Sequence, residues 1–330
     1  MSATAFARGS LRMLVLIVAA FLSVTYAKQV LRWSDEFRAG CTDTSVCVNG
    51  GIDLRKWSFD LGDGTDYGPN MIGWGNWQRQ CHTNSSANAR VEAFPGKTDG
   101  MLVIQGGYSP LRTCYNENAA PSTTNYTSAR LTTRNTAAFK WTGTAGNSTA
   151  VRIDVRLQVP SVSGTWPAAW MLPTTDKRWC SGCSAYGDGW CLGGEIDIME
   201  HVNTNNFLIA NVHYGGQANA SWLDCHEKVG RFRASSRAFA WNTLSLVWDS
   251  TYIRFLANGK EFSRLNAGDW YTGGADPAAN KFAPFDQDFF LILDMAIGGL
   301  YPGFNIDDAA VAAGKARYHI DYVRVYDLLP

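Results

Sequence analysis

Three carboxylates lie within the six residues Glu195, Ile196, Asp197, Ile198, Met199 and Glu200. Acidic side chains interleaved with apolar ones are typical of a β-strand with one buried face. On an unbroken strand Glu195 and Asp197 share a face, and Glu200 points to the opposite one. One extra residue, held as a β-bulge near Ile198 and Met199, would return Glu200 to the face of the other two acids; bulges are common beside active sites.

With that bulge the two glutamates predict a specific chemistry. Their Cα atoms would lie about 13 Å apart, at about 3.3 Å per strand residue. Long side chains that lean toward each other could narrow the gap between carboxyl groups to about 5 to 5.5 Å, as a retaining glycosidase requires for its nucleophile and its proton donor. A solvated strand face or a calcium site would explain the same six residues, so the rest of the chain must decide.

Short runs of β-type residues recur along the chain and predict an all-β sandwich. The clearest is residues 151–157, where Val, Ile, Val and Leu alternate strictly with Arg, Asp and Arg. Turns rich in Gly, Asn and Pro separate the runs, and no sustained helical periodicity or internal repeat interrupts them. The predicted strands are 101–105, 128–133, 151–157, 195–200, 207–213, 243–248, 252–257, 289–296 and 318–326.

The N-terminus carries Arg8 and Arg12, an apolar run over residues 13–24, and Thr25-Tyr26-Ala27. That run is too short for a comfortable membrane span, so we expect a secretory signal peptide over residues 1–27 rather than an uncleaved anchor. Residues 28–330 then form a single domain, and an all-β domain of about 300 residues is reasonable. Cleavage of the signal would remove Arg8 and Arg12 and leave a net charge of about −2. The sequence has no cluster of basic residues of the kind that binds nucleic acid.

The chain has eight cysteines, all of them after the predicted signal. An even number in a secreted protein favours disulfides, up to four of them here. Cys180, Cys183, Cys191 and Cys225 could imitate a zinc site, but secretion favours bridges. The connectivity is not readable, although Cys41 and Cys47 could close a small loop. Glycosylation sequons at Asn84, Asn125, Asn147 and Asn219 agree with a secreted surface.

Tryptophan is abundant, with 13 residues, and several of these lie beside Gly or Pro in turns. Sugar rings pack their C–H faces on aromatic rings, so tryptophans that line a cleft are a usual means of holding a glycan. Residues 62–78 read as a long loop that carries exposed Trp74 and Trp77, unless the aromatics pin this loop to the core. Trp166 and Trp170 immediately precede the loop that leads to the acidic strand, although core packing remains the alternative for each.

The residues resemble glycoside hydrolase family 16, in particular its laminarinase-like endo-β-1,3-glucanases. The acidic strand resembles the family signature, in the variant with the extra residue. Other blocks match in the family's order and cover essentially the whole chain after residue 27: 33–37, 73–76, 126–130, 166–173, 211–215, 284–287, 296–299 and 321–326. The resemblance implies a β-jelly-roll sandwich of the concanavalin A-like type, with an open glycan-binding cleft on its concave sheet.

The resemblance also implies roles for individual residues. Glu195 would be the nucleophile, Glu200 the acid/base, and Asp197 the carboxyl between them. His213 would lie near the leaving group, or else be a structural strand histidine. Arg130 would reach sugar hydroxyls, or else form a strand-face salt bridge. The remaining implied substrate contacts are Trp74, Asn76, Trp166 and Trp170.

The chain departs from the family pattern inside the expected cleft. Laminarinases commonly carry Glu where this chain has Gln78, and Asn is expected where it has Asp294. A cysteine-bearing insertion, residues 174–194, brings Trp179 and Trp190 to the predicted cleft mouth. These departures leave the preferred glucan open: pure β-1,3, β-1,6-branched, or mixed β-1,3/1,4.

The resemblance implies no cofactor for catalysis. Some family members bind a structural calcium ion through a carboxylate of the last strand, and Asp321 lies in the matching block; a hydrogen bond to loop backbone is the alternative. The sequence therefore predicts a secreted, monomeric retaining endo-β-1,3-glucanase that acts on a β-glucan polysaccharide, with no membrane association after signal cleavage. A wall-remodelling transglycosylase and a non-catalytic β-glucan-binding protein are the competing functions.

Overall fold

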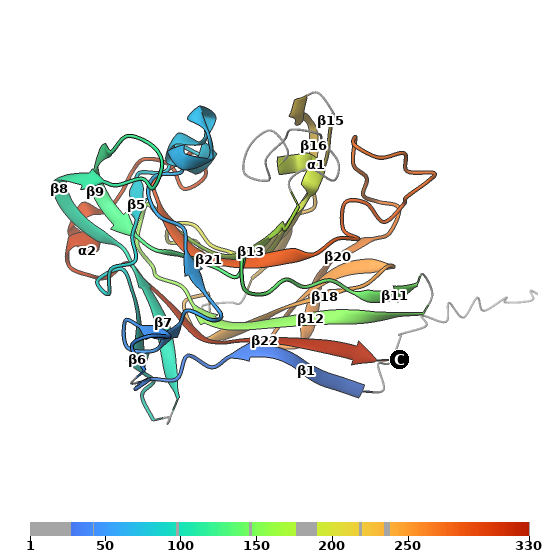
Figure 1. The fold of residues 1–330 in the computed structure, drawn as a ribbon, viewed down its shortest axis with the longest axis horizontal. Coiled ribbons are helices and arrows are strands. Elements are labelled where there is room, and N and C mark those ends of the chain that lie inside the picture. The colour runs from blue at the N-terminus through green and yellow to red at the C-terminus, as the bar shows by residue number, and fades with distance from the viewer. Residues whose placement is uncertain are drawn as a thin grey trace, which may run out of the picture.

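The computed structural model describes residues 28–41, 43–96, 99–144, 147–175, 190–217, 220–233 and 238–329. The predicted signal peptide, Cys180, Cys183 and Trp179 lie outside these ranges, as does Asn219. Strands dominate the described residues, and two large antiparallel sheets stack face to face. Figure 1 shows the two layers, with β12, β22 and β1 in the lower one and β13 and β21 above them.

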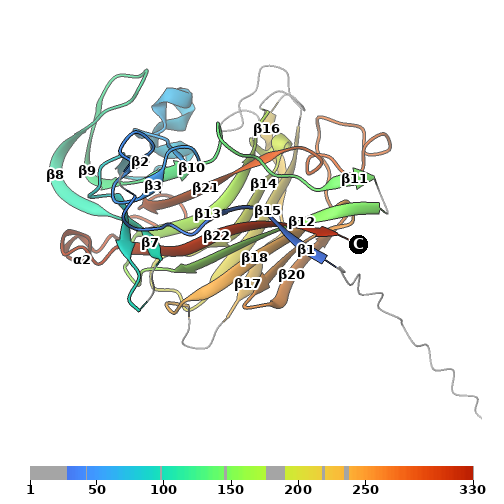
Figure 2. The ribbon, with the colours of Figure 1, turned by 60° about the horizontal axis from the view of Figure 1, so that its bottom comes forward.

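The first sheet has nine strands, and its register is antiparallel throughout. β1 runs beside the C-terminal strand (Figure 2). In spatial order the strands are β20 (Lys260–Asn266), β19 (Tyr252–Ala257), β18 (Asn242–Trp248), β12 (Asn147–Gln158), β22 (Arg317–Leu329), β7 (Gly100–Gln105) and β6 (Ala89–Ala93), with β1 (Lys28–Asp35) beside β22 and β11 (Thr142–Thr144) beside β12.

The second sheet has eight strands and contains the acidic segment as β14. In spatial order these strands are β16 (Ala220–Glu227), β15 (Leu208–Gln217), β14 (Glu195–Glu200), β13 (Thr165–Pro173), β21 (Phe289–Ile297), β10 (Arg130–Thr132) and β4 (Ser58–Phe59), with β17 (Gly230–Phe232) beside β15. The all-β jelly-roll sandwich that the sequence predicted is therefore confirmed.

Smaller elements complete the described part of the chain. They are the pair β2 (Cys47–Val48) and β3 (Ile52–Asp53), the sheet of β5 (Gln80–His82), β9 (Ser122–Ser128) and β8 (Gly107–Cys114), the 3-10 helices η1 (Thr65–Tyr67) and η2 (Pro69–Gly75), and the short helices α1 (Trp190–Gly193) and α2 (Asp308–Ala312). No helix among the described residues is long and apolar enough to cross a membrane.

The core lies between the two sheets and follows from strand periodicity. On β12 the side chains of Val151, Ile153, Val155 and Leu157 are fully buried, as the strict alternation predicted. On β21 successive residues are buried on both faces. One face joins the main core, and the other packs against Met71 of η2. The outer face of the second sheet is thus partly covered by η2, which forms one wall of the site described below.

Three disulfides link the described cysteines: Cys41–Cys47, Cys81–Cys114 and Cys191–Cys225. The small loop closed by Cys41 and Cys47 is the pair that the sequence suggested. Cys191 and Cys225 are bridged to each other, which excludes these two thiols as zinc ligands and confirms the expectation of a disulfide. Because Cys191 belongs to α1, this bridge ties the helix that carries Trp190 to β16.

The predicted calcium ligand Asp321 lies on β22 with its carboxylate buried. Its carboxylate forms an ion pair with the Arg156 guanidinium. Calcium needs six to eight oxygen ligands, and no group of three acidic, histidine or cysteine ligands forms around Asp321 among the described residues. The Asp321 carboxylate is therefore paired with Arg156, and a structural calcium ion at this position stays a prediction.

Candidate active site

The acidic strand contains the predicted bulge. β13 pairs Trp170 with Asp197 and Ala169 with Met199, so Ile198 has no partner residue on that side, and the register with β15 shifts over the same residues. The side chains of Ile198 and Met199 are consecutive, yet both are buried in the core. This extra inward residue returns Glu200 to the outer face of the sheet, where Glu195 and Asp197 already point.

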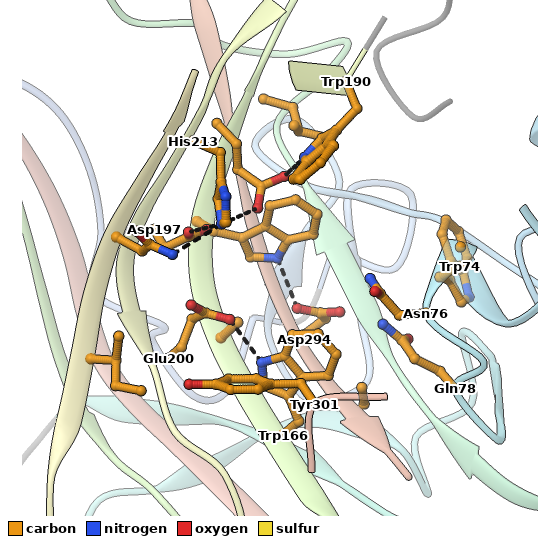
Figure 3. A pocket seen from close by; sticks show the side chains of 18 of the residues that line it. Trp74, Asn76, Gln78, Trp166, Trp190, Asp197, Glu200, His213, Asp294 and Tyr301 are labelled. Atoms are coloured by element: carbon orange, nitrogen blue, oxygen red, sulfur yellow. Dashed lines mark hydrogen bonds and ion pairs between the residues drawn. The ribbon is translucent and has the colours of Figure 1, made fainter. Parts of the chain in front are cut away.

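A pocket of about 670 Å³ lies on that outer face. Its floor comes from β10, β13, β14, β15 and β21, and its sides come from η2, the residues after it, α1 and the loop after β21. Every residue predicted to bind or transform a glycan lines it: Glu195, Asp197, Glu200, Trp166, Trp170, His213, Arg130, Asn76 and Trp74. Figure 3 shows Asp197, Glu200 and His213 pointing into this space from neighbouring strands.

Indole N–H groups donate hydrogen bonds to three acids of the pocket. Trp190 Nε1 lies 2.7 Å from Glu195 Oε2, Trp166 Nε1 lies 2.9 Å from Glu200 Oε1, and Trp170 Nε1 lies 2.9 Å from Asp294 Oδ1 (Figure 3). Each bond fixes the direction of one carboxylate and the tilt of one aromatic ring. The tryptophans therefore orient the acids and also supply apolar ring surface to the pocket.

Burial raises the pKa values of all three acids of β14. It raises the pKa of Glu195 to about 8, although hydrogen bonds from Trp190 and Asp197 lower that pKa, and negative charge on Glu200 raises it further. Burial raises the pKa of Glu200 to about 7, against the hydrogen bond from Trp166. Burial, then the charge of Glu195, raises the pKa of Asp197 well above its usual range. The three acids therefore titrate as a coupled set, and at least one of them keeps its proton near neutral pH.

His213 lies on β15 opposite Glu195. Its Nε2 atom is 3.5 Å from Asp197 Oδ2 and 3.8 Å from Glu195 Oε1, and the amide of Asn211 lies 3.0 Å from the same ring nitrogen. Burial lowers the pKa of His213 to about 4. The ring is therefore neutral at physiological pH and contributes a polar contact without a positive charge.

Arg130 belongs to the floor of the pocket, and its side chain is buried. Its guanidinium pairs with Asp60 at 3.1 Å and with Asp294 at 3.5 Å. It also lies between two aromatic rings, 4.4 Å from the centroid of Trp74 and 4.7 Å from that of Trp170. The strand-face salt bridge that the sequence left open is therefore present, and contact between Arg130 and a sugar hydroxyl stays a prediction.

The expectation that Trp74 is exposed is wrong. Its side chain is only 4 % exposed, because it packs against Tyr67, His82 and the Arg130 guanidinium. Trp77, three residues later, is 64 % exposed. The loop is thus pinned by one tryptophan and presents the other to solvent.

Several lining residues were not found from the sequence. Tyr301 packs edge-on against Trp166, with ring centroids 5.2 Å apart. Asn211, Glu227 and Arg231 line the same pocket from β15, β16 and β17. The available signals were the position of Tyr301 just after the Gly298-Gly299 turn and the place of Asn211 in the family-like block 211–215. Nothing local distinguishes Glu227 and Arg231 from ordinary strand residues.

Comparison with known proteins identifies the family. The chain is 33 % identical over 299 residues to a beta-glucanase of Rhodothermus marinus, which covers 90 % of this chain and 84 % of that protein. It is 31 % identical over 304 residues to glucan endo-1,3-beta-glucosidase A1 of Niallia circulans, but that match spans only 37 % of the bacterial protein. A non-specific endo-beta-1,3(4)-glucanase from glycoside hydrolase family 16 superposes with a TM-score of 0.64 at 26 % identity, over 92 % of each chain. No protein-family model matches the chain.

The chain belongs to glycoside hydrolase family 16. Two departures of this family 16 domain from the pattern described above lie in its pocket. Gln78 accepts a hydrogen bond from the Gln80 side chain at 2.7 Å, so it adds no charge to the pocket wall. Asp294 accepts from Trp170 and pairs with Arg130, and its negative charge also raises the pKa of Glu200. The family 16 site in this chain thus has one acid fewer at its wall and one more two strands from Glu200, with Ala168 between them.

Proposed function

We propose that this protein hydrolyses internal β-1,3 linkages of a laminarin-type β-glucan by double displacement, with retention of anomeric configuration. The observation that carries the proposal is the bulge in β14, which puts Glu195 and Glu200 on the floor of the same pocket, close enough for the charge of Glu200 to raise the pKa of Glu195. Two interacting carboxyls beside an aromatic-lined pocket support the two-carboxylate chemistry of a glycosidase. The names of the relatives support β-1,3-glucan as the substrate.

In the first step the Glu195 carboxylate attacks the anomeric carbon, and the glycosidic C–O bond breaks. Glu200 gives its proton to the departing oxygen, which leaves a glycosyl ester on Glu195. In the second step Glu200, now ionised, takes a proton from water as that water attacks the anomeric carbon. The ester bond breaks, and Glu195 and Glu200 regain their starting charges.

The hydrogen bonds favour this division of roles. Glu195 accepts from Trp190 and from Asp197, and both bonds stabilise its carboxylate. Because the charge on Glu200 raises the pKa of Glu195, protonation of Glu200 makes ionisation of Glu195 easier. The state competent for the first step then has Glu195 ionised, with Asp197 and Glu200 both protonated. In this state Asp197 donates to Glu195 and assists its departure in the second step.

The raised pKa of Glu200 predicts the alkaline limb of the pH profile. Glu200 must be protonated for the first step, so kcat/KM is expected to fall as the pH rises through about 7, approaching about tenfold per pH unit. Initial rates on laminarin from pH 5 to 9 would test this. A profile that stays flat to pH 9 would contradict the assignment of Glu200 as the acid.

A panel of laminarin, lichenan, xyloglucan and agarose would test the substrate. We expect reducing ends from laminarin, with β-configured products detected first by NMR. Product masses would separate hydrolysis from transglycosylation, because transfer yields chains longer than the starting oligosaccharide. Binding of laminarin without release of reducing ends would instead indicate a non-catalytic glucan-binding protein.

We infer that the protein acts outside the cell as a monomer of one catalytic domain. The disulfides among the described residues support an oxidising compartment. The predicted signal over residues 1–27 supports the same conclusion from the sequence. N-terminal sequencing of the exported protein and its elution volume on gel filtration would test these two inferences.

A further inference from the structure

Exposed apolar side chains gather at one edge of the pocket. Ten large hydrophobic side chains are exposed among the described residues, and five of these ten belong to two short loops, 72–77 and 300–304. Trp77, Leu300 and Phe304 are 64 %, 62 % and 51 % exposed. We call these three residues the rim patch.

The two loops of the rim patch are bonded to each other. The backbone N–H of Leu300 donates to the carbonyl of Asn76 at 2.8 Å. A Cβ on Gly299, whose φ is +120°, would lie 2.9 Å from the same carbonyl oxygen, so the close approach requires glycine here. The Arg79 guanidinium lies 4.8 Å from the ring centroid of Phe304. The patch is therefore held in place before any ligand arrives.

The rim patch begins where the pocket ends. Asn76 and Gln78, the two neighbours of Trp77, both line the pocket, and so does Tyr301, the neighbour of Leu300. A chain that leaves the pocket at this edge would meet the rim patch next. Figure 3 shows Asn76, Gln78 and Tyr301 with their side chains directed toward the pocket.

The backbone at Trp77 adds a second observation. Its φ is +57°, in the left-handed region that is unfavourable for a bulky residue. Because most of the Trp77 side chain is exposed to solvent, contacts with the rest of the protein do not offset the cost of this backbone conformation. A strained residue that presents a large aromatic ring to solvent at the edge of a pocket indicates binding.

We propose that the rim patch binds further glucose units of the same β-glucan chain that occupies the pocket. The inference rests on the proposed function and extends it to a preference for long chains over short ones. Aromatic and aliphatic side chains suit the C–H faces of the sugar rings, and the amides of Asn76 and Gln78 can bond hydroxyl groups as the chain crosses the edge.

The test compares a long and a short substrate. In Trp77→Ala and Phe304→Ala, kcat/KM on polymeric laminarin is expected to fall about tenfold, mostly through KM, because truncation of an interface aromatic commonly costs more than 1 kcal/mol. An aryl glycoside of laminaribiose is too short to reach beyond the pocket and should be cleaved at the wild-type rate. Tyr115→Ala removes an equally exposed aromatic that does not line the pocket and should leave both rates unchanged.

Three outcomes would overturn the inference. Wild-type rates on laminarin in both rim variants would show that the patch does not bind the chain, and equal losses on both substrates would show that it only shapes the pocket. A wild-type dimer on gel filtration that becomes a monomer in Trp77→Ala would make the patch an interface between copies of this chain. Failure of the wild type to cleave either substrate would refute the proposed function instead, so the two failures are distinguishable.

Discussion

Replacement of Glu195 by Gln is expected to lower kcat on laminarin by about 10⁴-fold or more, as loss of a nucleophile does in other covalent mechanisms. The amide keeps the size of the side chain and can still accept from Trp190, whose N–H lies 2.7 Å from Oε2 in the native protein. Glucan affinity should therefore stay close to the wild-type value. Reducing-sugar release and calorimetric titration with laminarin oligosaccharides would measure the two effects.

The same variant is expected to be more stable at alkaline pH. The folded-state pKa of Glu195 is raised from 4.5 to about 8, so the native state holds this proton more tightly than the unfolded state does. The contribution of Glu195 to stability is complete below about pH 4.5 and is lost as the pH rises toward 8. Gln does not titrate, and the Tm difference between variant and wild type should widen over that window.

Glu227→Gln supplies the matched control, because Glu227 lines the same pocket but is exposed to solvent. It should retain most of the activity on laminarin. Wild-type turnover in Glu195→Gln would refute Glu195 as the nucleophile. A constant Tm difference from pH 5 to 8 would refute its burial as an acid with a raised pKa.

Replacement of Glu200 by Gln is expected to lower kcat on laminarin by about 10³-fold, within the range for loss of a general acid and base. The variant keeps the nucleophile, so an aryl glycoside with a good leaving group should still form the glycosyl ester. Water would then resolve that ester slowly, because its base is missing. A burst of aryl product followed by a slow steady state is the expected kinetic signature.

Rescue by azide would distinguish loss of the acid/base Glu200 from general structural damage to the active site. As a small anionic nucleophile that needs no base, azide should restore turnover of the aryl glycoside in Glu200→Gln and yield a β-glycosyl azide. It should give no rescue of this kind in Glu195→Gln at the same concentration. A rescued product of α configuration in Glu200→Gln would mean that Glu200, and not Glu195, is the group that attacks the sugar.

Much of the architecture could be predicted because strand signals are local. The alternation in residues 151–157 placed β12 and its buried face, and the run at residues 195–200 gave β14 its bounds. The bulge was also predictable, because the acids at Glu195 and Glu200 can share a face only if two successive apolar residues, Ile198 and Met199, both turn inward. The other site residues were predicted from the resemblance to the family, because no strand periodicity indicates that these separate segments meet at one site.

The sequence by itself thus determined the sandwich, the bulged acidic strand and a part of the set of residues that line the pocket. Only the tertiary structure decided which aromatics and charges are exposed there. Trp74 is buried because the loop folds so that Tyr67 and His82 pack against its ring. Arg130 is paired with Asp60 and Asp294, which lie 70 and 164 residues away in the chain. Trp77 is left exposed. The pattern of apolar and polar residues along a strand predicts which face of the sheet each side chain points to. Whether a particular ring or charge is buried depends also on the side chains packed against it, and those contacts form only when the chain folds.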